Sequence, residues 1–179
     1  MENEQKLWLG ISISAFVALL IIVGGYNPAD LLRSNDDDEL YSTATSKHPL
    51  AKDCLGGHEN QVFHYHAELQ IYIDEQPVLI PGDVGLNDGE CSMRLLHTHS
   101  ENGVIHIELK QQADAPLEAF FDVWGKHFDK NGFDTHRVNS THELVMEVNG
   151  EINNEFNNYI LNDDPNNSDR IIIRYQERS

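Results

Sequence analysis

The stretch Leu95–Lys110 decides how this chain folds, and it reads Leu-Leu-His-Thr-His-Ser-Glu-Asn-Gly-Val-Ile-His-Ile-Glu-Leu-Lys. The Asn102-Gly103 pair stands between two runs of strand-forming residues, and this dipeptide is the strongest short-range signal for a tight β-hairpin. We therefore predict an antiparallel hairpin that turns at Asn102-Gly103.

The length of the turn determines which side chains face one another. With a two-residue loop, His99 lies opposite His106, and His97 lies opposite Glu108. Residues directly opposite in an antiparallel pair share one face of the sheet, with Cβ atoms roughly 5 Å apart. A four-residue loop over residues 100–103 changes the pairing but keeps the same residues on that face, whereas a three- or five-residue loop does not. The hairpin therefore predicts three imidazoles and one carboxylate in one patch.

A second stretch, residues 62–73, carries the same chemistry and reads Val-Phe-His-Tyr-His-Ala-Glu-Leu-Gln-Ile-Tyr-Ile. Its alternation of apolar and polar residues predicts a half-buried strand, with His64, His66 and Glu68 on the polar side. Together with the hairpin, this strand predicts one sheet whose first face covers an apolar core and whose second face is lined by histidines. The histidines of this predicted face are His64, His66, His97, His99 and His106.

The charge of the chain excludes several classes of partner. Among 179 residues, 12 are basic and 30 are acidic, which gives a net charge of −18. Such a chain is not expected to bind nucleic acid, anionic lipid or calmodulin, all of which require basic surfaces or helices. The length suits one ordinary domain with a tail.

The N-terminal part of the chain predicts a membrane anchor. Residues 1–6 form a short polar tail, and residues 7–26 are uncharged and mostly apolar. At about 1.5 Å per residue, such a run is long enough to cross a hydrocarbon core of ~30 Å. Trp8 and Tyr26 stand near its ends, as interfacial aromatic residues do. A cleaved signal peptide is the alternative, but acidic residues precede the run and no Ala-x-Ala site follows it.

Residues 27–50 are rich in acidic and hydroxyl residues and predict a disordered stalk, followed by a histidine-rich α+β domain over residues 51–179. The basic residues hardly decide the orientation of the anchor. The cysteines and two sequons, at Asn139 and Asn166, favour a single-pass protein of the cell membrane with this domain outside. His48 and His58 lie at the edge of the domain and are interpreted as solvated surface histidines.

The two cysteines lie close to the two histidine stretches. Cys54 precedes the first strand, and Cys91 precedes the hairpin. A disulfide between them would fix the histidine strands together in an oxidising compartment. Two free thiols and metal ligation are the alternatives.

The rest of the chain predicts one helix and two further strands. Leu117, Phe120, Phe121 and Trp124 recur at helical spacing, with Asp114 as the expected N-cap and a stop at the following glycine. We interpret this aromatic stripe as a core layer rather than the lining of a ligand pocket.

Residues 144–148 and 171–175 predict strands. The order is α+β, and we expect an N-terminal transmembrane helix plus one β-grasp-like domain, a mixed sheet with one packed helix. A small sandwich or a cupin-like barrel is the alternative.

Four motifs resemble those of a group of largely uncharacterised archaeal and bacterial proteins that are membrane-anchored or secreted, and the resemblance covers most of residues 60–175. The motifs are His64-Tyr65-His66-Ala67, Leu96-His97-Thr98-His99, Gly103-Val104-Ile105-His106-Ile107-Glu108 and Phe120-Phe121-Asp122-Val123-Trp124-Gly125. An aspartate often follows the second histidine of the Leu-His-Thr-His motif in that group, whereas this chain has Ser100 there. The resemblance implies a common site but brings no established activity with it.

A metal ion is the expected ligand of the histidine face. Two histidines spaced i, i+2 on a strand project from one face about 6.5–7 Å apart, so that both can reach one ion. Nitrogen ligands suit zinc, copper(II) or nickel, whereas calcium and magnesium prefer oxygen. We predict a copper or zinc ion, held most economically by His97, His99 and His106 with one of His64 or His66. A polar face that binds a covering loop or a partner protein is the alternative.

Three functions remain open from the sequence. The first is a membrane-anchored, extracytoplasmic protein that handles copper or zinc. The second is a metalloenzyme with an open coordination position, in which Glu108 or Glu68 acts as the base. The third is an interaction module that uses the histidines as an interface without metal.

Overall fold

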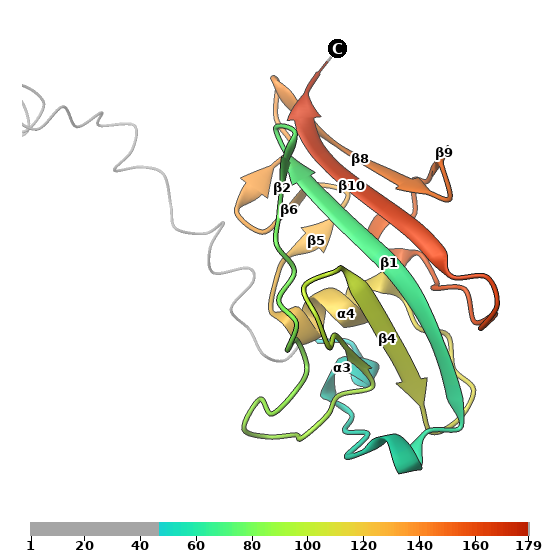
Figure 1. Ribbon diagram of the computed structural model, residues 1–179. Helices are drawn as coiled ribbons and strands as arrows, with labels where there is room; N and C mark the ends of the chain where they lie inside the picture. Colours follow the sequence, from blue (N-terminus) through green and yellow to red (C-terminus); the bar gives the residue numbers. More distant parts are fainter. Residues whose placement is uncertain (1–46, 179) are drawn as a thin grey trace, which may run out of the picture. The chain divides into compact units, whose positions relative to one another are not determined.

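A mixed β-sheet organises the part of the chain that the computed structural model describes, residues 47–178 (Figure 1). The strand order is β3-β4-β1-β10-β8-β9, and β2 also pairs with β1. The two central strands, β1 and β10, are parallel, and all other neighbours are antiparallel. The strands are β1 (Phe63–Ile73), β2 (Gln76–Pro77), β3 (Leu96–His97), β4 (Val104–Leu109), β8 (His142–Val148), β9 (Glu151–Ile152) and β10 (Asp169–Glu177).

Short helices and a second, small sheet lie beside this main sheet. The helices are α3 (Pro49–Lys52) and α4 (Leu117–Trp124), with the 3₁₀ turns η1 (His58–Asn60) and η2 (Phe156–Asn158). The small sheet contains β5 (Phe128–Asp129), β6 (Gly132–Phe133) and β7 (His136–Arg137). The described residues therefore form a mixed α+β fold, as predicted.

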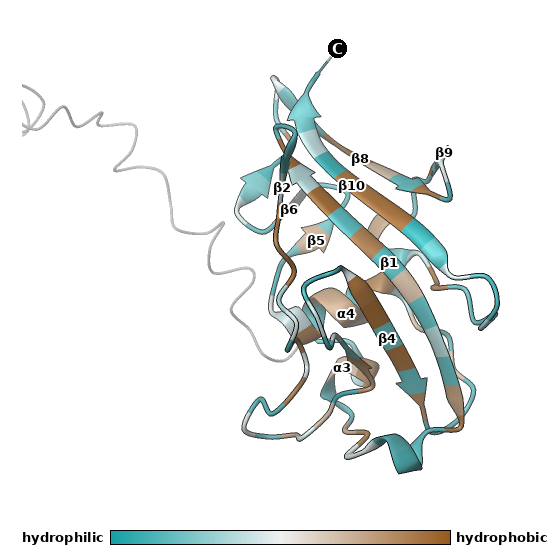
Figure 2. Cartoon of the chain, viewed as in Figure 1, coloured by the Kyte–Doolittle hydropathy of each residue, from teal (hydrophilic) through white to brown (hydrophobic). Residues whose placement is uncertain are grey.

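The apolar core lies between the main sheet and α4. Apolar and polar residues alternate along β1, β4 and β10, so that each strand turns one row of side chains towards the core (Figure 2). Phe120 and Phe121 of α4 are fully buried, and the Phe121 ring stacks on Phe128 with centroids 4.4 Å apart. The prediction that the aromatic stripe forms a core layer is confirmed. The polar side chains of these strands therefore lie on the opposite face of the sheet.

The start of α4 differs from the prediction. The N-cap is Pro116 rather than Asp114, and it makes no side-chain capping bond. The Leu117 amide instead donates to the Tyr159 carbonyl at 2.8 Å, so a neighbouring segment takes the place of a capping side chain. At the other end, Gly125 adopts a left-handed φ of 73° and ends the helix as predicted.

The predicted tail, membrane span and most of the predicted stalk lie outside the described residues. Within residues 47–178, no helix combines the length and the apolar character needed to cross a bilayer. Residues 47–50, placed by the sequence at the end of the stalk, pack here against α4: the His48 amide donates to the Asp122 carboxylate at 2.6 Å.

The register of the histidine hairpin corrects one detail of the prediction. His97 pairs with His106, which contradicts the two-residue loop and matches the four-residue alternative that keeps the same face. The reason is Thr98, which leaves the hairpin: its amide donates to the Val84 carbonyl at 3.1 Å, and its hydroxyl donates to the Pro81 carbonyl at 2.6 Å. The turn therefore begins earlier than the Asn-Gly pair alone indicates.

Gly103 holds the end of this turn against β1. It has a φ of +77°, and its carbonyl accepts a hydrogen bond from the Leu69 amide at 2.9 Å. A Cβ atom at this position would collide with the Leu69 carbonyl oxygen. The position therefore requires glycine both for its backbone conformation and for close approach.

We expect Gly103→Ala to lower the free energy of unfolding by about 2 kcal/mol more than Gly89→Ala, measured by urea unfolding of the full chain. Gly89 is the matched control because its φ is +91° and no heavy atom lies within 4 Å of its Cβ position. Equal losses in the two variants would show that the contact with Leu69 does not constrain the hairpin.

Candidate metal centre

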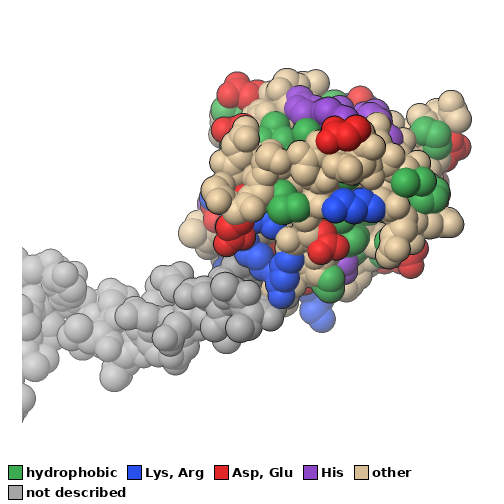
Figure 3. Space-filling view, turned by 90° about the horizontal axis from the view of Figure 1, so that it is seen from below, with side chains coloured by type: hydrophobic (Ala, Val, Ile, Leu, Met, Phe, Trp, Pro, Cys, Tyr) green, Lys and Arg blue, Asp and Glu red, His purple; other side chains and the backbone are tan. Residues whose placement is uncertain are grey.

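Cross-strand pairing places three imidazoles in one row. His106 of β4 lies opposite His97 of β3 on one side and opposite His66 of β1 on the other. His64 is paired with Glu108 in the next polar row of β1 and β4. Because paired residues share a face, all of these side chains project from the side of the sheet opposite α4. Figure 3 shows the histidine side chains gathered in one patch of the surface.

The His106 ring stands at the centre of the cluster. Its centroid lies 4.5 Å from that of His66 and 4.7 Å from that of His99, both edge-on. The rings of His97 and His64 stack against it at 5.4 and 5.7 Å. The structure thus brings together all five histidines that the sequence proposed as metal ligands.

The ring nitrogens of the cluster have the spacing of metal ligands. His97 Nε2 and His99 Nε2 are 3.1 Å apart, and His106 Nδ1 lies 3.1 Å from His66 Nε2 and 3.4 Å from His64 Nε2. Two nitrogens on a tetrahedral zinc ion, each at about 2.0–2.1 Å from it, would be about 3.3 Å apart. In two sets of three, each containing His106, all ligand atoms lie within 4.8 Å of one another. These sets are His64, His66 and His106, and His97, His99 and His106.

His106 Nδ1 cannot make a full hydrogen bond to both neighbouring imidazoles at once. A neutral imidazole has one N–H and one lone pair, so His106 Nδ1 can accept only one of the two donors that could approach it from His64 and His66. Three nitrogens that converge on one point are better satisfied by a cation. The structure therefore supports a metal site on this face at the level of geometry.

A hydrogen bond to the main chain fixes the orientation of the His97 ring. Its side chain is fully buried, and its Nδ1 lies 3.0 Å from the Arg94 carbonyl oxygen. Because a carbonyl only accepts, Nδ1 carries the proton and Nε2 is left with its lone pair directed towards the cluster. A hydrogen bond of this kind is the usual support of a metal-binding histidine.

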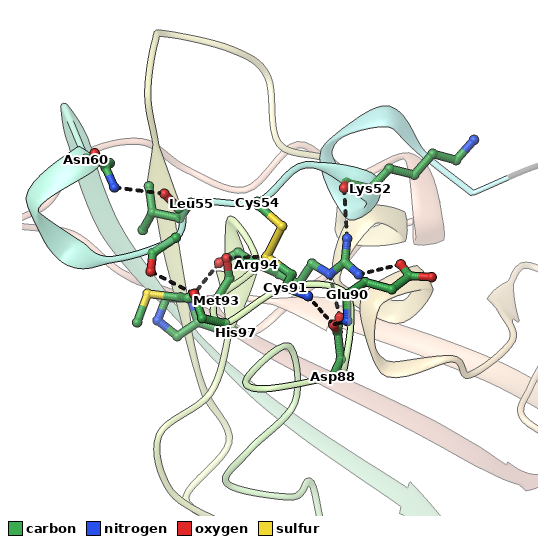
Figure 4. Close-up of a disulfide and its surroundings, with 12 residues drawn as sticks. Lys52, Cys54, Leu55, Asn60, Asp88, Glu90, Cys91, Met93, Arg94 and His97 are labelled. Atoms are coloured by element: carbon green, nitrogen blue, oxygen red, sulfur yellow. Dashed lines mark hydrogen bonds and ion pairs between the residues drawn. A yellow bond between two sulfur atoms is a disulfide. The ribbon is translucent and has the colours of Figure 1, made fainter.

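A disulfide and a buried arginine hold the segment behind His97. Cys54 and Cys91 form a disulfide with an S–S distance of 2.13 Å, as predicted (Figure 4). The Arg94 side chain donates to the Lys52 carbonyl at 2.8 Å and to the Glu90 carboxylate at 2.9 Å. These contacts join the chain before β1 to the chain before β3, so the two histidine stretches are fixed with respect to each other.

Glu108 is the carboxylate of the cluster. Its side chain is fully buried, and its two oxygens lie 2.8 and 2.9 Å from His58 Nδ1. Oε1 is also 3.5 Å from His64 Nε2 and 3.9 Å from His97 Nε2. With its amide oriented to satisfy both polar atoms, Gln61 donates to Oε2 at 2.8 Å. A buried carboxylate among imidazoles orients the rings and supplies negative charge for a bound cation.

His58 is the member of the cluster that the sequence analysis missed. It was interpreted as solvated, and its side chain is 53% exposed, yet it contacts Glu108 and lies 5.5 Å from the His99 ring between centroids. The cysteine pair was the available signal, because a disulfide at Cys54 brings the following residues, η1 included, to the β3 side of the sheet.

The structure places Glu68, His48 and His142 outside the histidine cluster. Glu68 is exposed and paired with Val104, one row beyond the histidines, so Glu108 is the carboxylate that the site contains. His48 caps α3, where its Nδ1 accepts a hydrogen bond from the Leu50 amide at 3.2 Å. His142 stacks on Tyr175 in another part of the sheet.

No protein-family model, curated protein or solved structure matches this chain. The resemblance to membrane-anchored or secreted proteins stays a prediction.

Burial keeps the central imidazoles neutral. It lowers the pKa of His97 to about 4, and the nearby His99 and His58 add to this shift. Burial also lowers the pKa of His106 to about 4, with His66 and the other neighbouring imidazoles contributing. At neutral pH the lone pairs of both residues are therefore free of protons and available to a metal ion.

These pKa values predict an acid-sensitive metal-free fold. Because unfolded histidines take up protons near pH 6.5, the contribution of His106 to stability is complete above that pH and is lost as the pH falls to about 4. Urea unfolding of the full chain, stripped of metal, should show a decline over this window that is smaller by about 2 kcal/mol in His106→Gln, after allowance for partial solvent screening. Identical declines in wild type and variant would show that burial in the fold does not lower the pKa of His106.

Proposed function

We propose that this chain is a membrane-anchored, extracytoplasmic protein that binds copper or zinc and handles the ion for delivery, storage or sensing. The observation that carries the proposal is the convergence of His97, His99 and His106. The Arg94 carbonyl holds His97 in the tautomer that can bind a metal through Nε2. The Nε2 atoms of His97 and His99 are 3.1 Å apart.

The type of ligand limits the type of ion. Imidazole nitrogens favour zinc, copper(II) or nickel over calcium and magnesium, which require several oxygens. The lowered pKa values of His97 and His106 mean that protons do not compete with the ion at neutral pH. Glu108, the buried carboxylate of the cluster, adds negative charge without changing this preference.

The exposure of the site favours exchange of the ion rather than a purely structural role. His97 is fully buried and anchors the set, but His99 and His64 are exposed. A set of three imidazoles on an open face leaves a coordination position for water or for a donor from another molecule. An ion held in this way can be received from or passed to a partner.

Three features support the proposed location outside the cytoplasm: the apolar N-terminal run, the disulfide and the two sequons. The apolar run over residues 7–26 supplies the anchor through which the chain would contact the membrane. The Cys54–Cys91 disulfide and the two sequons suit an oxidising space outside the cytoplasm. The net charge of −18 argues against a nucleic-acid partner.

The resemblance to membrane-anchored or secreted proteins agrees with this placement. We also assign the fold to the β-grasp-like class, because β1 pairs with β4 and runs parallel to β10 beside it, with α4 in the intervening chain.

A metalloenzyme is the second candidate, and one observation favours it. Each set of three imidazoles resembles an open catalytic site, and Glu108 lies 3.5 Å from His64 Nε2. In this alternative the imidazoles would hold the ion, the ion would activate a bound water, and Glu108 would accept a proton. Its contact with His58 would then have to give way.

The test is the metal content of the full chain, purified without a histidine tag and measured by mass spectrometry. We expect about one or more equivalents of copper or zinc, and at least a tenfold loss of affinity in His97→Ala/His99→Ala, since two of the three nitrogen ligands are removed.

The matched control is His136→Ala/His142→Ala, which removes two histidines outside the cluster and should keep the metal. A chain that binds neither ion would leave the histidine face as an interaction surface. Unchanged affinity in the His97/His99 variant would place the metal elsewhere.

A further inference from the structure

We propose that the histidine face holds two metal ions at once, with His106 as a ligand shared between them. This inference rests on the proposed function, because it assumes that the face binds metal at all. It goes further in assigning a second site, on the β1 side of His106, to His64 and His66.

The cluster divides into two sets around one residue. His64 and His66 come from β1, and His97 and His99 come from β3 and the residues after it, so the two pairs reach His106 from opposite neighbouring strands. The nitrogens within 4.8 Å of one another form two sets of three, each including His106. A single ion bound by one set therefore leaves the other pair of imidazoles without it.

This division differs from the ligand set that the sequence suggested. His97, His99 and His106 were expected to take one of His64 or His66 as a fourth ligand. In the structure neither β1 histidine joins that set, because both direct Nε2 at His106 Nδ1, at 3.4 and 3.1 Å.

An imidazole can serve two ions because its ring has two nitrogens. One nitrogen has a single lone pair, so occupation of both sets at the same time requires one ion at each ring nitrogen of His106. The Nδ1 atom faces His64 and His66, which leaves Nε2 for the ion of His97 and His99. On binding of the second ion the ring N–H bond breaks, its proton goes to solvent, and the freed electron pair forms the second metal–nitrogen bond.

The Glu108 carboxylate lies close to an imidazole of each set. Its Oε1 is 3.5 Å from Nε2 of His64, a member of the first set, and 3.9 Å from Nε2 of His97, a member of the second. The side chain is fully buried, so its charge is poorly screened by water. A carboxylate beside both sets offsets part of the repulsion between two divalent ions, as the negative imidazolate of His106 also does.

The test uses the full chain, without a tag and stripped of metal, titrated with copper(II). Mass spectrometry after gel filtration should find about two equivalents in the wild type and about one in His64→Ala/His66→Ala and in His97→Ala/His99→Ala. The control His142→Gln removes a histidine outside the cluster and should keep about two equivalents. Because His97 is buried, the single variants of exposed ligands, His64→Ala and His99→Ala, repeat the test with folding checked by circular dichroism.

Electron paramagnetic resonance tests the shared ligand. Two copper(II) ions on one imidazole ring would be about 6 Å apart, from two metal–nitrogen bonds of about 2 Å and the width of the ring. We expect exchange coupling, seen as reduced intensity of the main signal and a half-field signal. His106→Ala should abolish it.

Each other outcome is decisive. One equivalent in the wild type, lost in the His97/His99 variant, would overturn the second site but leave the proposed function standing. No bound copper or zinc would overturn the proposed function itself. Two equivalents without coupling, unchanged in His106→Ala, would show that His106 is not shared.

Discussion

The pairing of His106 with His97 on one side and His66 on the other is the constraint on which the site depends. Side chains alternate strictly along a strand, so a shift of β4 by one residue would send His106 into the core and Ile105 or Ile107 to the surface. Burial of the apolar row therefore fixes the positions of the imidazoles. The free energy gained by burying the apolar side chains of the sheet therefore also brings the imidazoles together.

The histidine cluster places polar groups close together and partly out of water, unlike the apolar core beneath it. Several imidazole rings converge here, and Glu108 is fully buried among them. Polar groups in this position are costly unless they are paired. The disulfide, Arg94 and the His58 contact hold the groups in place from behind, which is the arrangement expected of a preorganised site rather than of a surface that merely tolerates histidines.

The sequence predicted the parts of the site that follow from periodicity. Alternation in residues 62–73 and 104–109 placed the histidines on the face opposite the core, and the positions of the two cysteines predicted their bridge. Local patterns could not supply the register, because Thr98 bonds to Val84 and Pro81 rather than continuing the hairpin.

The same limit applies to His58 and to the choice between the two glutamates. His58 reaches Glu108 only through the path of the chain after the disulfide, and Glu68 misses the cluster because it pairs with Val104. Both facts depend on contacts between residues distant in sequence. Periodicity identifies a face, but not which members of that face touch.

The histidine metal centre is tested most directly by anomalous X-ray diffraction from crystals of the full chain loaded with copper, recorded at the copper absorption edge. We expect the strongest anomalous peak within bonding distance of His97 Nε2, His99 Nε2 and the His106 ring. A peak bound only by carboxylates elsewhere on the acidic surface, or no peak at the cluster, would contradict the claim that the histidine face is a metal centre.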